Sequence, residues 1–211
     1  MNLEKESEER YMEHLKWSPC VEVESHNGVR EVSIYTKHLA NRRIFLSGEI
    51  RQEMANDIAA QLLYLEAESD EPIFLYINSN GGEINAGLYL YDVLQAMKAP
   101  VYTYCTGIAA SMAAVLLAGG QPGRRLILPH SKTMIHEPLL TGGVGGSATS
   151  IRNISDSILE TKRIVNSILA KHTGKSLKEI DKATAFDNYM NAEKSVSFGL
   201  CDRVVTSMLE I

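Results

Sequence analysis

The sequence of 211 residues is poor in cysteine and has no excess of basic charge, and both shortages exclude classes of protein. Its three cysteines, Cys20, Cys105 and Cys201, form neither a C-x-x-C pair nor the Cys/His spacing of a zinc site. A disulfide framework and a metal centre are therefore not supported, and we expect buried thiols in a reducing compartment. The formal net charge of −5 argues against nucleic acid or an anionic membrane as partner, because those partners select a basic face.

Long apolar runs and nucleotide-binding motifs are also missing. The apolar stretch 106–120 ends in Gly119-Gly120, which is short of the roughly 18 residues that a membrane span needs. Residues 1–18 form a charged leader without the apolar core of a secretory signal, so we expect a cytoplasmic protein. No G-x-x-x-x-G-K-[ST] motif occurs, so the chain is not itself a P-loop nucleotidase.

The sequence does contain a regular alternation of strand-like and helix-like segments. The strand-like segments are 44–48, 72–78, 100–105, 124–129 and 133–136, and the helical patterns cover 53–68, 83–99 and 106–120. In the first helix the apolar residues Ile58, Leu62, Leu63 and Leu65 recur at helical spacing. Such alternation predicts βα crossovers and a largely parallel sheet, which is the α/β class.

The second half of the chain has a different pattern. A glycine-rich stretch at 141–148 is followed by a long amphipathic helix that Gly174 ends. The apolar stripe of that helix consists of Ile151, Ile154, Ile158, Val165, Ile168 and Leu169. The sequence SLKE at 176–179 is a capping box, which predicts the start of another helix. A long helix that projects from an α/β body has little to pack against in a monomer, so we interpret the region around 141–172 as an interaction handle.

Ser111 is a single hydroxyl in the small and apolar stretch 106–120. A serine among alanines often only allows close packing, so a structural role is one interpretation. The other is a nucleophile near the start of a short buried helix entered through Gly107, where N–H groups and the helix dipole stabilise negative charge. A nucleophilic serine needs a base, and His136, at the end of the strand-like segment 133–136, has the best context among the six histidines. The pair Gly81-Gly82 follows another strand and allows main-chain N–H groups to approach a ligand closely.

Four segments in this order resemble one family, the proteolytic subunit of the ATP-dependent Clp protease. They are LYINSNGGEINAGLYLYD (75–92), GIAASMAAVLLAGG (107–120), LPHSKTMIHEPL (128–139) and NAEKSVSFGLCDRV (191–204). The resemblance extends from about Pro19 to the C-terminus. It implies a spiral of repeated β-β-α units, a fold shared with crotonases, with a protruding handle helix. It also implies a serine peptidase domain over residues 19–211, preceded by a leader or axial segment.

The resemblance also implies roles for particular residues. Ser111 matches the nucleophile, His136 the general base and Asp187 the acid that orients it. Gly82 and Met112 match the backbone donors of the oxyanion hole. The positions Tyr76, Tyr104 and Leu128 match a cleft where the partner ATPase docks. The family's chemistry needs no metal and no cofactor.

The same resemblance implies an assembly. Seven subunits form a ring, two rings stack into a tetradecamer, and a separate AAA+ ATPase unfolds protein substrates and feeds them to the enclosed sites. Two alternatives remain at this point. One is a structural or regulatory subunit that is active only beside a paralogous ring, and the other is a crotonase-type acyl-CoA enzyme.

The sequence departs from the family pattern in four places. Asn80 replaces a proline before the glycine pair, and Thr106 replaces an aliphatic residue of the docking cleft. Ala185 and Phe186 replace an acid and an arginine that bond across rings. The glycine-rich handle segment is longer and lacks the family's glutamine. The triad residues are thus all present, while the contacts between rings and with the ATPase differ.

Overall fold

The computed structural model describes residues 19–25, 28–140 and 145–208. The chain divides into two compact units, residues 1–44 and 45–211. The described part of the first unit has an antiparallel hairpin of β1 (Cys20–Ser25) and β2 (Gly28–Ser33), followed by α2 (Ile34–Ala40). The Ser33 hydroxyl caps α2 by accepting from the Thr36 amide. The expected boundary at residue 18 borders residues that are not described, and it stays a prediction.

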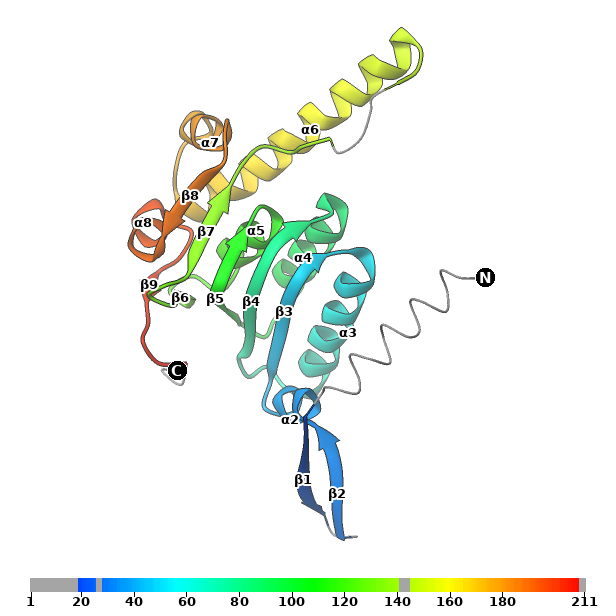
Figure 1. The fold of residues 1–211 in the computed structure, drawn as a ribbon, viewed down its shortest axis with the longest axis vertical. Helices are drawn as coiled ribbons and strands as arrows, with labels where there is room; N and C mark the ends of the chain where they lie inside the picture. Colours follow the sequence, from blue (N-terminus) through cyan, green and yellow to red (C-terminus); the bar gives the residue numbers. More distant parts are fainter. Residues whose placement is uncertain (1–18, 26–27, 141–144, 209–211) are drawn as a thin grey trace. The chain divides into compact units, whose positions relative to one another are not determined.

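A mostly parallel sheet forms the centre of the second unit (Figure 1). Its order is β3-β4-β5-β6-β9, and β7 pairs with both β5 and β8. The strands are β3 (Arg43–Ile50), β4 (Ile73–Gly82), β5 (Val101–Ala110), β6 (Arg125–Ile127), β7 (Lys132–Ile135), β8 (Asn188–Asn191) and β9 (Arg203–Val204). The pairs β4–β5, β5–β6, β5–β7 and β6–β9 are parallel, and β7–β8 is antiparallel. The predicted α/β class is confirmed.

Three helices follow strands; the first packs against the second, and the second and third pack against each other and against the sheet (Figure 1). They are α3 (Gln52–Glu68), α4 (Ile84–Ala96) and α5 (Met112–Ala118). Helix α3 buries Ile58, Leu62 and Leu65, as its spacing predicts, but the Leu63 side chain is exposed. All seven residues of α5 are buried, because this short helix packs against β4, β5 and α4.

Helix α6 (Ala148–Thr173) extends beyond the sheet, and only its C-terminal half packs against the body (Figure 1). Val165 and Leu169 are buried, whereas Ile151 at the other end of the predicted apolar stripe is exposed. The helix ends as predicted at Gly174, which adopts φ 71° in the left-handed region. Of the glycine-rich stretch, residues 141–144 lie outside the described part of the chain.

Two further helices complete the fold, α7 (Leu177–Thr184) and α8 (Ala192–Phe198). The capping box predicted at 176–179 is present, because Ser176 and Glu179 each accept from the other's backbone amide. In the described part of the chain no helix is both long and apolar enough to cross a bilayer.

Burial separates the three cysteines into two kinds. Cys105 and Cys201 are buried, and burial raises the pKa of the Cys105 thiol to about 11 and that of Cys201 further still. Cys20 is exposed, so the expectation of a buried thiol is wrong at this position. Burial fails there because Cys20 begins a two-stranded hairpin whose side chains are largely exposed.

Candidate active site

Ser111 lies at the junction between strand β5 and helix α5 with a strained backbone. Its φ of 54° and ψ of −124° are unusual for a residue with a side chain, and such strain costs about 1–3 kcal/mol. The Ser111 amide donates to the Met134 carbonyl at 2.8 Å, which fixes the junction to the neighbouring strand β7. A strained turn held in this way presents the side chain at the end of the strand.

The structure corrects where the helix begins. Residues 101–110 are all strand, and α5 begins only at Met112, so Gly107 is not a helix entry. Gly107 instead admits the Asn78 side chain, whose Oδ1 would lie 2.5 Å from a Cβ at that position. The same Oδ1 accepts from the Ile108 amide at 3.2 Å. Ser111 is therefore one residue ahead of the helix, with the N–H groups of its first turn immediately beside it.

The glycine pair 81–82 ends strand β4 beside this junction. A Cβ on Gly81 would lie 2.6 Å from the Ala110 carbonyl oxygen, 2.8 Å from Ser111 Cβ and 3.1 Å from the Met112 nitrogen. A Cβ on Gly82 would instead collide with Ile50 of β3, at 2.2 Å from its carbonyl oxygen. Both glycines have positive φ, 89° and 156°. The sequence singles out the pair 81–82 as a whole, and the contact with β5 that distinguishes Gly81 from Gly82 has no local sequence signal.

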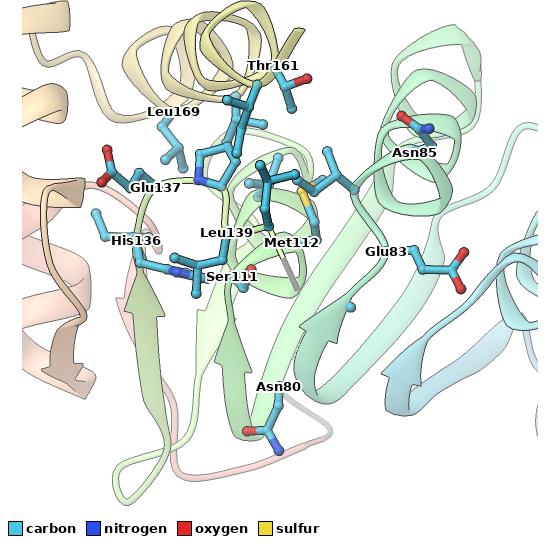
Figure 2. A pocket seen from close by; sticks show the side chains of 18 of the residues that line it. Asn80, Glu83, Asn85, Ser111, Met112, His136, Glu137, Leu139, Thr161 and Leu169 are labelled. Carbon is cyan, nitrogen blue, oxygen red and sulfur yellow. The ribbon is translucent and has the colours of Figure 1, made fainter. Parts of the chain in front are cut away.

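His136 is placed next to Ser111 by the pairing of two parallel strands. Ala110 of β5 pairs with Met134 of β7, so the residues that follow both strands emerge at the same sheet edge. Both side chains line the same pocket (Figure 2). His136 Nδ1 is buried and has no hydrogen-bond partner among the residues that the structure describes.

Asp187 reaches His136 through the antiparallel strand β8. Ile135 of β7 pairs with Asn188 of β8, so the residue before Asn188 faces the residue after Ile135. The distance from His136 Nδ1 to Asp187 Oδ1 is 3.9 Å, and the Asp187 side chain is 57% exposed. This distance exceeds a hydrogen bond by about 1 Å, so the acid and the base are adjacent but not engaged.

A pocket of about 960 Å³ joins these residues to the handle helix. The predicted residues Ser111, His136, Asp187, Gly82 and Met112 all line it. Much of the remaining lining is apolar, with Val115, Leu139, Ile154, Ile158, Val165 and Leu169. The geometry offers a hydroxyl, an imidazole, a carboxylate and main-chain donors around a space that is large enough for a peptide segment.

Tyr76, Tyr104 and Leu128 lie together in a different place. Tyr76 and Tyr104 are 5% and 1% exposed, with ring centroids 5.0 Å apart, in a cluster against which Leu128 packs. Burial raises the pKa of the Tyr104 phenol, and its hydroxyl has no hydrogen-bond partner within the described residues. Thr106 directs its hydroxyl inward and donates to the Ile77 carbonyl at 3.3 Å. The predicted cleft residues thus share one aromatic cluster, separate from the pocket.

Two other features concern what surrounds the site. Among the described residues no group of three or more His, Cys, Asp and Glu side chains is placed to hold a metal ion. Ala185 and Phe186, just before Asp187, are exposed, and Phe186 is 86% exposed.

The chain was also compared with models of known protein families. The model described as Clp protease matches residues 26–208. The match covers every residue that lines the pocket, from Glu49 to Asp187.

Proposed function

The chain belongs to the Clp protease family and is a serine-type peptidase, and from that premise we propose that Ser111, His136 and Asp187 are its catalytic triad. The observation that supports this proposal is the strained junction of Ser111, which is bonded to β7 and lines one pocket with His136 (Figure 2). A structural serine in a packed helix needs no positive φ. Strain of this kind persists where a side chain must be presented.

The proposed reaction is acyl transfer to Ser111 followed by hydrolysis. Ser111 Oγ attacks the peptide carbonyl carbon, and His136 Nε2 takes the hydroxyl proton. The C–N bond then breaks, the leaving amine takes that proton, and a peptidyl ester remains on Ser111. Water, deprotonated by His136, cleaves the ester and restores the hydroxyl. Asp187 accepts from His136 Nδ1 and stabilises the imidazolium in both steps.

The oxyanion of each tetrahedral intermediate is bound by main-chain donors in this proposal. Met112 is the first residue of α5, so its N–H has no acceptor within the helix. Gly82 supplies the second donor from the end of β4. Each such donor contributes about 3–4 kcal/mol to the transition state. Gly81 keeps the approach open, because a side chain there would lie 3.1 Å from the Met112 nitrogen.

The separation of 3.9 Å between His136 and Asp187 bears on when the site is active. We propose that the single chain shows the triad before engagement and that assembly or substrate closes the gap.

Members of this family form oligomeric rings and act with a partner ATPase. For this chain we propose heptameric rings stacked as a tetradecamer, fed with unfolded proteins by an AAA+ Clp ATPase in the cytoplasm. Docking of that ATPase is proposed at the predicted cleft of Tyr76, Tyr104 and Leu128, with the partly buried Leu128 at the surface and the buried Tyr76 and Tyr104 supporting it from below.

One observation favours a second function, that of a ring subunit active only beside a paralogous ring. Ala185 and Phe186 cannot form the ionic bonds that the resemblance implies between rings, and they directly precede Asp187. Peptide hydrolysis by the purified protein alone distinguishes this function from that of an autonomous peptidase. The crotonase alternative has lost its support, because the family match extends through the triad positions.

The proposed triad is tested by labelling with a fluorophosphonate and by hydrolysis of a short fluorogenic peptide. We expect Ser111→Ala to abolish both, and His136→Ala to remove nearly all hydrolysis. Asp187→Asn should lower kcat by up to about four orders of magnitude, because the imidazole loses its orienting partner. Ser197→Ala, at an exposed serine of α8, is the matched control and should label normally. Undiminished labelling of Ser111→Ala would refute the assignment.

A further inference from the structure

Two residues of the handle helix α6 are bonded to the segments that carry the proposed base and acid. Lys162 forms an ion pair with Glu137, the residue after His136. Asn166 donates to Asp181 at 2.6 Å and accepts from the Thr184 hydroxyl at 3.5 Å. Lys162 and Asn166 are four residues apart, so they lie on one face of the helix.

The two attached segments are also bonded to each other. The Glu137 amide donates to the Thr184 carbonyl at 2.7 Å. Thr184 is three residues before Asp187, and Asn188, just after it, donates from its side chain to the Ala183 carbonyl at 3.1 Å. His136 and Asp187 therefore lie next to two segments that are bonded to each other. Helix α6 is bonded to both segments, through Lys162 and Asn166.

We propose that Lys162 and Asn166 are positioning residues that set the separation of His136 and Asp187. We call these two residues, with their partners Glu137, Asp181 and Thr184, the handle clamp. The inference rests on the proposed function, because it gives the handle helix a part in engaging the same triad. A shift of about 1 Å separates the present 3.9 Å from a hydrogen bond, and an error of that size costs up to about a hundredfold in rate.

The two contacts differ in burial, which decides what each can contribute. Asn166 is 1% exposed, so its amide must be bonded, and it fixes the α6–α7 junction rigidly. The side chains of Lys162 and Glu137 are 30% and 39% exposed, and such an ion pair adds little to stability. Removing the ion pair should therefore change the rate of reaction without unfolding the protein.

The test removes the charges of Glu137 and Lys162 one at a time and then exchanges them. For each variant kcat, KM and the thermal unfolding midpoint are measured. We expect Lys162→Met and Glu137→Gln each to lower kcat at least about tenfold, with KM changed much less, because the triad is misplaced while the pocket remains. The double variant Glu137→Lys/Lys162→Glu restores the pair and should recover most of kcat. Arg163→Gln, at the neighbouring exposed cation of α6, is the matched control and should leave kcat unchanged.

A second readout does not depend on activity. Hydrogen exchange of the Glu137 amide reports its bond to Thr184, and we expect faster exchange in both single variants and recovery in the double variant. Unchanged kcat and unchanged exchange in the single variants would overturn the clamp while leaving the triad intact. A wild-type protein whose Ser111 takes no probe would overturn the proposed function instead, and the exchange measurement would still decide the clamp.

Discussion

Gly81 is important for the site because it has no Cβ atom. A Cβ there would lie within 3.1 Å of Ala110, Ser111 and Met112 atoms, so Gly81→Ala must displace the junction that carries the hydroxyl. We expect kcat to fall about a hundredfold or more, since a shift of about 1 Å has that effect. Peptide hydrolysis and Ser111 labelling measure it. Gly123→Ala is the matched control, because Gly123 also has positive φ, 81°, but nothing lies within 4 Å. Equal activity of the two variants would mean that Gly81 is kept only for its backbone angle.

His172, near the end of α6, gives a prediction about pH. Burial, and then the charges of Lys171 and Arg125, lower the pKa of this imidazole from 6.5 to about 4. Its Nε2 lies 2.8 Å from the Tyr91 hydroxyl. The unfolded chain therefore binds a proton at this residue between pH 6.5 and pH 4 while the folded chain does not, and stability falls as pH decreases through that window.

The measurement is the thermal unfolding midpoint as a function of pH. We expect a flatter decrease between pH 6.5 and pH 4 for His172→Gln than for the wild-type protein, because the variant has no proton to bind. His130→Gln, at an exposed histidine, should keep the wild-type slope. Identical slopes for wild type and His172→Gln would show that burial does not hold this imidazole neutral.

At the scale of elements, the sequence predicts helices well where the capping and stop residues agree with the helical spacing of the apolar residues. The capping box at Ser176, the stop at Gly174 and the apolar spacing of α3 are local features, and the structure has them, except that Leu63 of α3 is exposed. The sequence places Gly107 to Ala110 in a helical pattern, because these small residues have no alternation of apolar and polar side chains that would indicate a strand. It is strand because β4 and β7 pair with it on both sides. Such pairing is decided by distant segments, and a local pattern cannot contain it.

The same distinction explains which parts of the site the sequence could reveal. Ser111 and His136 follow strands of a parallel sheet, and a sheet of this class brings such ends together. Asp187 lies just before the short strand β8, whose antiparallel register with β7 has no sequence signal. Only the resemblance to a family singled it out from Asp181 and Asp202. The contacts of Glu137, Lys162 and Asn166 were missed for a similar reason, since they join three elements.

The junction of α6 and α7 provides the prediction at this scale. Asn166→Asp would place a carboxylate opposite Asp181, 2.6 Å from the present amide nitrogen, in a position that is 1% exposed. We expect a loss of about 1–3 kcal/mol in the free energy of unfolding, because the hydrogen bond of the buried Asn166 to the more exposed Asp181 becomes a repulsive contact. The double variant Asn166→Asp/Asp181→Asn exchanges the two groups and should regain most of the loss. Denaturant unfolding measures both, and failure of the exchange to rescue stability would show that the hydrogen bond is not what joins the helices.

At the scale of the whole molecule, several large apolar side chains are exposed near the site and on the handle. Phe186 is 86% exposed, Tyr189 58%, and Leu159 and Ile151 of α6 are 55% and 45% exposed. Phe186 and Tyr189 flank Asp187 in the sequence. A partner that covers them would therefore also affect the position of Asp187, the acid of the proposed triad. Their exposure supports the proposal that the segment around Asp187 and helix α6 are covered in an assembly.

The last prediction concerns that assembly and follows from Ala185 and Phe186. Ala185 can supply no charge-assisted bond, and Phe186 offers only apolar contact, which contributes through burial and has no preferred direction. We expect rings of this chain alone to stack weakly and to hydrolyse peptides slowly, because His136 and Asp187 stay 3.9 Å apart.

Ala185→Asp/Phe186→Arg restores the pair that the resemblance implies and should strengthen both stacking and turnover. Sedimentation velocity and peptide hydrolysis on the same samples measure this. A wild-type double ring that is stable at low micromolar concentration, with high turnover, would mean that Phe186 burial has replaced the ionic link and that the triad engages without it.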